Sequence, residues 1–492
     1  MTVAPPPRGR KAIGTGMTAL CGGKRHDRGA EQRPPAPDRG SLVLRLGRLL
    51  ELAARWPLWR PGGAFRAMCV LLFIVALWRF SYPFVAGSEV SLSSEPVQIS
   101  LHQHAGRGFS SPFYSHFTGP TAHTAPVFPY FLTFIWGVFG VGASGVFVFS
   151  NAAAVALAAQ AALLPAVARS LGMHVSVGLM AALITIAPRN GVQTFFLWEA
   201  NYVAVLALLV TLGMCKMVQG PERPLRHSVL LSFLWGVLLL ASPGTLLPYC
   251  GWLVWLAFFA RKSHLPKRDG IASLAAMVVI PALVLLPWTL RNHSVFGEWF
   301  FVRDNLGLEL MVSNNHCAQF GAKVNQGSGC YDTIHPQNNA SIARRLQQMG
   351  EPAFNHEMRE KAVEWIRQNP RQFFTLTLQR FWFFWFPSTV GDNLEDLLGG
   401  ATGLTLLFGS TTLLSIPGLF LLFKKHRAGG VFCLLWLGCF PLIHYVVQFE
   451  DRYRAPILWL TFLLGAYALM HAGLWIMRRA GLPESSIAPY DR

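Results

Sequence analysis

Long apolar runs separated by short polar loops make up most of the 492-residue chain. A helix needs about 20 largely apolar residues to cross the roughly 30 Å hydrocarbon layer of a bilayer. Runs long enough to cross, assigned so that the basic loops between them share one side, predict about ten transmembrane helices. They lie near residues 67–86, 143–166, 171–188, 195–217, 229–244, 246–260, 270–290, 402–423, 429–447 and 455–477. The pattern indicates an all-α, polytopic membrane protein.

The basic residues between these runs set the expected orientation. On the same side as the N-terminus lie Lys216–His227, Arg261–Arg268, Lys424–Arg427 and Arg478–Arg479. Lys and Arg are enriched in cytoplasmic loops, so both termini are expected in the cytoplasm. Segments 87–142, 291–401 and 448–454 are then expected to lie outside. A further apolar run, Val127–Gly140, would break this pattern if it crossed. It is predicted to be a re-entrant or interfacial helix.

Five regions follow from this pattern. Residues 1–66, in which Lys and Arg far outnumber Asp and Glu, are expected to be a disordered cytoplasmic tail with an interfacial helix at 41–56. The other four are an N-terminal membrane domain (67–290) with the first external loop (87–142), a small external domain (291–401), C-terminal membrane helices (402–477) and a cytoplasmic tail (478–492).

Composition supports a membrane protein and limits its partners. Hydrophobic residues make up 52% of the chain and charged residues 13%, and the mean hydropathy is +0.37. These values do not suit a soluble chain of this length. A formal net charge of +18 would suggest nucleic acid in a soluble protein, but here the charge lies in loops beside the membrane. Anionic membrane lipids are therefore expected as partners, and nucleic acid is not.

The segment Glu95–Pro129, just after the first span, carries the richest polar chemistry. Glu95 precedes Pro96, which suits the first turn of a helix and places Glu95 at its cap, with the helix ending near Gly106. The helix dipole there favours an ionised carboxylate, and a carboxylate within hydrogen-bond reach of a hydroxyl can act as a general base. Glu95 is the first candidate and Glu89 the second. The alternative is that Glu95 only caps the helix.

Other polar residues near this segment are candidates for a substrate pocket. The histidines are His102, His104, His116 and His123. Their spacing matches no fixed metal-ligand pattern, and such imidazoles more often line a polar pocket or surface. No metal or other cofactor is therefore expected, with a divalent cation as the less favoured alternative. Glu199 and Asn201, at the outer mouth of a span, are costly in lipid and are expected to face the cavity or to hold helices together.

The external segment 291–401 contains a predicted amphipathic helix within His356–Pro370. One face of this helix carries Met358, Ala362, Trp365 and Ile366. The following stretch, Gln379–Val390, is dense in Phe and Trp, which is typical of the lipid headgroup level. Cys317 and Cys330 lie in the same segment, and a disulfide or two free thiols are both open.

Several short blocks, within residues 67–477, share their order and external placement with a known family. They are GRGFSSPF (Gly106–Phe113) after an acidic residue, TGPTA (Thr118–Ala122), PVFPYF, PWTLRNHSVFGEWFFVRDNLGLEL (Pro287–Leu310), SNN (Ser313–Asn315) and RYRAPI (Arg452–Ile457). In these blocks the chain resembles the polyprenyl-phosphate-sugar-dependent membrane glycosyltransferases related to glycosyltransferase family 39. That family includes the protein mannosyltransferases and the aminoarabinose transferases that act on lipid A.

The resemblance implies a C-type glycosyltransferase fold, whose first external loop carries the catalytic carboxylate. It implies that a hydroxyl of a glycan, lipid or protein acceptor, deprotonated by this carboxylate, displaces a polyprenyl phosphate from the sugar in one inverting step. The expected setting is the periplasmic face of a bacterial inner membrane. The family's enzymes carry an aspartate in this loop, where this chain offers only Glu89 and Glu95.

A departing lipid phosphate needs positive charge, which guanidinium supplies through paired hydrogen bonds. The candidates are Arg107, Arg291, Arg303, Arg452 and Arg454. For the last two, the alternative is a structural pairing with Glu450 or Asp451. The related oligosaccharyltransferases use a divalent ion with acidic ligands, and the sparse carboxylates here argue against one.

Two other classes of function share the same hydrophobic pattern. A transporter or lipid flippase would also be polytopic, but the chain shows no internal repeat and almost no ionisable residue in the middle of a span, where ion-coupled carriers place them. A non-catalytic scaffold would bind polyprenyl lipids without turnover.

Overall fold

The computed structural model describes residues 60–85, 92–187, 198–220, 222–262, 267–386 and 401–483, with a few positions between 45 and 52. In these ranges the regular secondary structure is helical, and the β-pairing consists of two isolated bridges. The predicted disordered tail, most of the predicted interfacial helix at 41–56, and Glu89 lie outside the described residues.

Helices long and apolar enough to cross a membrane account for eight of the ten predicted spans. They are α2 (Gly63–Val85), α5 (Ala143–Ser170), α7 (Ala200–Val218), α8 (Pro224–Ala241), α10 (Lys267–Phe296), α18 (Ala401–Lys425), α19 (Arg427–Cys439) with α20 (Leu442–Val446), and α21 (Ala455–Arg479). The other two predicted spans are shorter apolar helices, α6 (Val175–Ile186, 12 residues) and α9 (Leu246–Lys262, 17 residues). The predicted all-α, polytopic membrane fold is confirmed.

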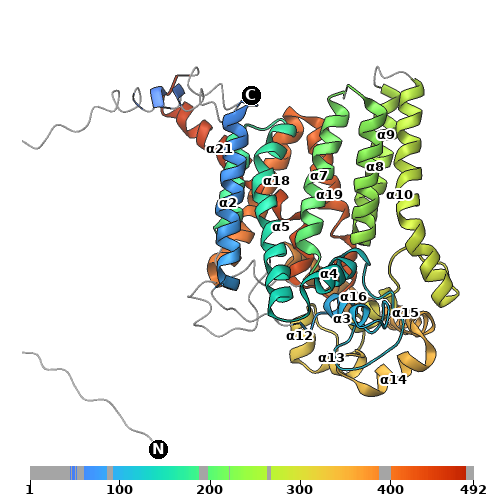
Figure 1. The fold of residues 1–492 in the computed structure, drawn as a ribbon. Helices are drawn as coiled ribbons and strands as arrows, with labels where there is room; N and C mark the ends of the chain where they lie inside the picture. Colours follow the sequence, from blue (N-terminus) through green and yellow to red (C-terminus); the bar gives the residue numbers. More distant parts are fainter. Residues whose placement is uncertain are drawn as a thin grey trace, which may run out of the picture.

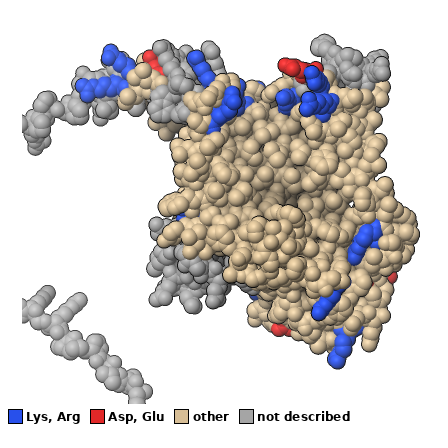
Figure 2. All heavy atoms as spheres, viewed as in Figure 1, with Lys and Arg blue, Asp and Glu red and all other residues tan. Residues whose placement is uncertain are grey.

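Small residues allow these helices to pack closely. Gly178 of α6 lies directly against the backbone of Pro165 in α5, and Gly418 of α18 lies against Leu464 of α21, so a larger side chain would collide at either position. On the outside of the bundle, apolar side chains such as Trp78 of α2 are exposed. Figure 2 shows a middle band free of charged residues, with Lys and Arg towards the two ends. This arrangement suits a bilayer around the band.

The remaining helices gather at one end of the bundle (Figure 1). They are α3 (Glu95–His104), α4 (Val127–Phe139), α11 (Leu306–Ser313), α12 (Ala322–Gly327), α13 (Cys330–Ile334), α14 (Ala340–Met349), α15 (Glu351–Gln368) and α16 (Pro370–Trp385). Phe113, from the loop after α3, packs with Leu308 of α11 and Phe354 of α15 in one apolar cluster. Two segments about 200 residues apart in the chain thus form one polar cap on the bundle.

Several local predictions in this cap can be compared with the structure. α15 buries Met358, Ala362 and Trp365 as the pattern indicated. It starts earlier than expected, and a second helix, α16, begins at Pro370, because proline suits the first turn of a helix as well as the end of the preceding one.

α4 has 13 residues, about 20 Å of helix, which is too short to cross a bilayer. Cys317 and Cys330 form a disulfide.

Arg380 of α16 holds the cap to the bundle. The side chain is fully buried, and its guanidinium donates to the Ser313 carbonyl, to Asn314 Oδ1 (3.1 Å) and to the Val446 carbonyl (2.8 Å). These acceptors belong to the end of α11 and to α20. A single side chain therefore ties together three helices that the sequence separates widely.

Replacing Arg380 by methionine is expected to destabilise the protein by about 3 kcal/mol, because buried carbonyls would lose their hydrogen-bond donors. Thermal unfolding of the detergent-solubilised protein measures the effect. Arg371→Met, an exposed position on the same helix, is the matched control and should leave the melting temperature unchanged. Equal melting temperatures for both variants would contradict this role of Arg380.

Candidate functional site

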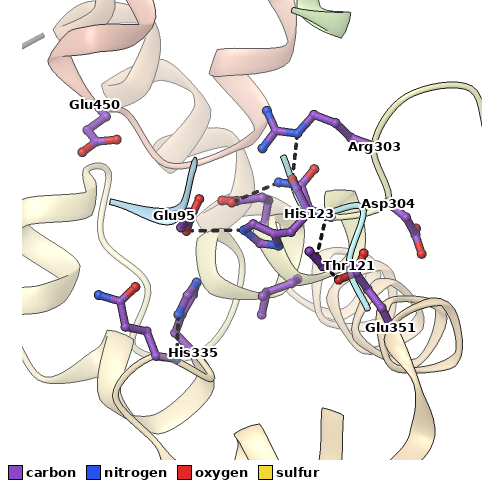
Figure 3. Close-up of polar contacts among 12 residues, drawn as sticks. Glu95, Thr121, His123, Arg303, Asp304, His335, Glu351 and Glu450 are labelled. Atoms are coloured by element: carbon purple, nitrogen blue, oxygen red, sulfur yellow. Dashed lines mark hydrogen bonds and ion pairs between the residues drawn. The ribbon is translucent and has the colours of Figure 1, made fainter. Parts of the chain in front are cut away.

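The carboxylate predicted as a base lies at the start of a helix. Glu95 is the first residue of α3, Ser94 is the N-cap and Pro96 occupies the first turn. The expected helix is confirmed, and its N-terminus favours a negative charge. Glu95 Oε1 lies 3.4 Å from His123 Nε2 in an ion pair (Figure 3). The side chain of His123 is 2% exposed and that of Glu95 15%, so the pair is shielded from water.

Each member of this pair alters the ionisation of the other. Burial raises the pKa of the Glu95 carboxyl, but the charge and contact of His123, with a contribution from Arg452, lower it to about 2. Burial lowers the pKa of His123, but attraction to Glu95, Glu309 and Glu351 raises it overall. Glu95 is therefore an ionised carboxylate at neutral pH, held beside an imidazole that favours its protonated form.

The loop that carries His123 contains one strained backbone position and is held by hydrogen bonds. Ser111 has a positive φ of 49°, which is uncommon for a residue with a side chain. Its hydroxyl accepts hydrogen bonds from the amides of Thr118 (2.9 Å) and Gly119 (3.2 Å). The ring of Phe113 meets that of His123 edge-on, with centroids 5.3 Å apart. The GRGFSSPF and TGPTA blocks thus form a single folded turn around the histidine.

Helix α13 supplies a second wall of the site. The buried His335 ring stacks on Tyr331 at 4.2 Å between centroids and meets Phe113 at 5.1 Å. Burial lowers the pKa of His335 to about 3, so this imidazole is neutral. Glu309 of α11 is half-buried nearby, and its partial burial together with the charge of Glu95 raises its pKa. The sequence did not single out these residues, which lie on short helices without a clear apolar period.

Arg452 brings positive charge from the start of the last span. It lies in the short helix η4 (Asp451–Arg454), 2.6 Å from Glu450 in an ion pair, and its guanidinium carbon is 3.2 Å from the centroid of the Trp198 ring. Its charge acts on both Glu95 and Glu199. The pairing with Glu450 is the one the sequence offered as an alternative. A guanidinium has five N–H donors, more than one carboxylate can accept.

The other candidate arginines differ in their surroundings. Arg303 donates its Nε to the His123 carbonyl at 2.9 Å and so belongs to the site. Arg291 donates to the Thr121 and Phe109 carbonyls, and the buried Arg454 donates to the Trp385 carbonyl and to Thr412. Both therefore hold backbone segments. Arg107 is exposed at the end of α3. The structure brings only Arg303 and Arg452 of these five to the Glu95–His123 pair.

The remaining pocket candidates are also spread out. His102 is half-buried against Phe117, with ring centroids 5.6 Å apart, and His104 is exposed. Asn201 is buried in α7, where its carbonyl accepts a hydrogen bond from Gln160. Among the histidines predicted for the pocket, only His123 contacts Glu95.

The acidic side chains near Glu95 allow a test of the less favoured expectation, a divalent cation. Among the residues that the structure describes, no three His, Cys, Asp or Glu side chains come together in a way that could hold a metal ion. Glu450 is paired with Arg452, and Glu95 with His123. The described residues therefore do not fit a metal centre.

Fold and site together define an all-helical, multi-pass membrane protein with buried acidic and basic groups at one end of the bundle. No protein-family model and no curated protein matches the sequence. The fold is similar to that of the archaeal oligosaccharyltransferase AglB from Archaeoglobus fulgidus, solved with an inhibitory peptide and a dolichol-phosphate, at a TM-score of 0.50 and 12% identity. The match covers 86% of this chain and 55% of AglB.

Two further structures are similar at low sequence identity. The apo form of the A. fulgidus oligosaccharyltransferase matches at a TM-score of 0.50 and 15% identity, over 86% of this chain and 53% of that one. ArnT from Cupriavidus metallidurans, bound to undecaprenyl phosphate, matches at 0.35 and 14%, over 83% and 78%. The two oligosaccharyltransferase structures, at a TM-score of 0.50 each, confirm the predicted C-type glycosyltransferase fold. The chain spans little more than half the length of the oligosaccharyltransferases it matches.

Proposed function

We propose that the protein is a membrane glycosyltransferase that moves a sugar from a polyprenyl-phosphate donor to an acceptor hydroxyl. The observation that carries this proposal is the ionised, shielded Glu95 carboxylate beside His123, within electrostatic reach of Arg452. A base for the acceptor and a cation for the leaving phosphate are the two groups that the reaction needs. The fold shared with AglB, whose structure was solved with a dolichol-phosphate, supports the choice of donor.

The reaction is a single displacement at the anomeric carbon. The acceptor oxygen forms a bond to that carbon while the bond from the carbon to the phosphate oxygen breaks, and the lipid phosphate leaves with the electron pair. The hydroxyl proton passes to Glu95. Attack on the face opposite the leaving group inverts the configuration of the sugar. Nuclear magnetic resonance of the product should therefore show the opposite anomer to the donor.

The low pKa of Glu95, about 2, sets the timing of the proton transfer. Such a carboxylate is a weak base, so the hydroxyl becomes acidic enough to lose its proton only when its oxygen is already bonding to carbon. Before that point Glu95 orients the hydroxyl as a hydrogen-bond acceptor. Arg452, with Arg303 near it, would bind the phosphate and stabilise the charge that develops on it.

The orientation in the membrane completes the proposal. The cap bearing Glu95 and the described part of the external segment, residues 291–386, lie at one end of the bundle (Figure 1), and Lys424 and Lys425, at the end of α18, lie at the other. With basic residues on the cytoplasmic side, as the positive-inside rule expects, this arrangement supports a site on the periplasmic face of a bacterial inner membrane, with both termini in the cytoplasm. The external domain would receive the glycan, lipid or protein acceptor.

A proteoliposome experiment separates this function from the transporter and scaffold alternatives. Purified protein is reconstituted with radiolabelled polyprenyl-phosphate sugars on the outer leaflet and supplied with a membrane extract as the source of acceptor. A transferase moves label from the lipid to an acceptor. Movement of intact donor to the inner leaflet would instead support a flippase, and donor binding without turnover would support a scaffold.

A further inference from the structure

A second buried carboxylate, Glu351, joins the external segment to the loop that carries His123. Glu351 is the first residue of α15 and is 7% exposed. Its Oε2 accepts a hydrogen bond from the Thr121 hydroxyl, and its Oε1 accepts one from the Ala122 amide at 2.6 Å. Thr121 and Ala122 are themselves buried. The glutamate is thus bound by the two residues that immediately precede His123, from 230 positions further along the chain.

The same short loop is held from other sides. Arg291 donates to the Thr121 carbonyl at 2.9 Å, and the Asp304 amide donates to the Ala122 carbonyl at 3.1 Å. The His123 amide donates to Thr121 Oγ1 at 3.0 Å. Thr121 Oγ1 therefore accepts from His123 and donates to Glu351. The glutamate thereby fixes the hydroxyl that orients the backbone of His123.

Two donors aimed at the two oxygens of one carboxyl group favour the ionised form, because hydrogen bonds to a charged acceptor are stronger than those to a neutral one. If Glu351 were protonated, the bonds from the Thr121 hydroxyl and the Ala122 amide would lose this charge assistance, and the protonated oxygen would have less capacity to accept. The loop would then be held more weakly. Because the Glu95–His123 contact is 3.4 Å long, a small displacement of the loop is enough to separate the pair.

We propose that Glu351 is a positioning residue, which in its ionised form holds the loop 118–123 so that His123 stays against Glu95. This inference rests on the proposed function, because its catalytic consequence is the loss of a correctly tuned base. Glu351 does not contact Glu95, and it acts through Thr121, Ala122 and His123.

The ionisation of Glu351 falls in a range that makes this role measurable. Burial raises its pKa to about 7, against the opposing effects of His123 and the two hydrogen bonds. The charged groups that face it are His123, Asp304 from the segment before α11, and Arg291 of α10. Glu351 loses its charge as the pH falls through about 7. Glu95, with a pKa of about 2, remains ionised there, so it cannot cause a change in rate near neutrality.

The test combines a pH profile with an observation that does not need activity. In the wild type, the rate of sugar transfer should fall as the pH drops from 8 to 6. Glu351→Gln keeps the shape and cannot titrate, so it should lower kcat about tenfold at pH 8, leave KM for the donor unchanged and remove the change near pH 7. Hydrogen–deuterium exchange of the peptide spanning 118–126 should be faster in this variant than in the wild type.

Matched variants separate positioning from general damage. Glu360→Gln changes an exposed residue of the same helix and should alter neither readout. Thr121→Val, which removes the hydroxyl between Glu351 and His123, should reproduce the effect of Glu351→Gln. Thr121→Ser, which keeps the hydroxyl, should behave like the wild type. This pair keeps the inference testable if Glu351→Gln fails to fold.

The outcomes distinguish this inference from the proposed function. If the wild type transfers sugar but Glu351→Gln keeps both the wild-type pH profile and the wild-type exchange, the positioning role is wrong and the transferase stands. If the wild type transfers no sugar from any donor, the proposed function fails, and exchange of the 118–126 peptide alone decides the role of Glu351. Equal exchange in the two proteins would then overturn it.

Discussion

Glu95→Gln is expected to reduce sugar transfer by about 10²–10⁴-fold, the range typical of losing a general base. Glutamine has nearly the same shape but cannot accept the hydroxyl proton. The substitution also removes the negative charge that keeps the pKa of the buried His123 raised, so the imidazole is expected to become neutral. Turnover of a radiolabelled polyprenyl-phosphate sugar at saturating donor measures the loss, and donor affinity should be retained.

Two controls limit the interpretation of this variant. Glu95→Asp keeps the charge but withdraws it from His123, and it should retain part of the activity. Glu360→Gln, an exposed glutamate of α15, should be fully active. Normal turnover by a folded Glu95→Gln protein would show that Glu95 only starts helix α3, the alternative that its position beside Pro96 also allows.

Arg452→Met is expected to weaken donor binding by about 100-fold, because a guanidinium forms charge-assisted hydrogen bonds with a phosphate that no neutral side chain can replace. Arg452→Lys keeps the charge but loses the paired donors, and it should recover only part of the affinity. Equilibrium binding of the donor to purified protein gives the comparison. An acceptor-independent measurement is preferable here, since the phosphate is the part of the donor that Arg452 would contact.

The ion pair with Glu450 must be considered in this experiment. Removing Arg452 alone leaves a half-buried carboxylate, Glu450, without its partner, which is destabilising in its own right. The double variant Glu450→Gln with Arg452→Met removes both charges and should bind donor as weakly as Arg452→Met while being better folded. Arg107→Met is the surface control. Wild-type donor affinity in the double variant would assign Arg452 a purely structural pairing.

The membrane fold could be predicted because the length of an apolar run is limited by the thickness of a bilayer. This constraint acts locally, so the helices can be located from the sequence without knowledge of their packing. The helix start at Glu95 was also local, since Pro96 fixes the geometry of the first turn. The amphipathic face of α15 followed from periodicity, and Met358 and Trp365 are buried as expected.

The polar cap could not be predicted, because its contacts join residues far apart in the chain. Glu351 meets Thr121 across 230 positions, and Tyr331 and His335 reach the site from a five-residue helix and the residue that caps it. Such short helices have no periodic signal. Arg454 had the same sequence signal as Arg452, yet its guanidinium is buried among Trp385, Thr412 and Thr461. The two arginines differ because their side chains leave η4 in different directions, which the sequence around them does not reveal.

The central claim is that this protein transfers a lipid-linked sugar with the help of Glu95. The most direct test incubates purified wild-type protein and Glu95→Gln side by side with radiolabelled polyprenyl-phosphate sugars and a membrane extract that contains the acceptor, and follows label from lipid to acceptor. We expect transfer by the wild type from at least one donor and its loss in the variant. Transfer by neither protein, or equal transfer by both, would contradict it.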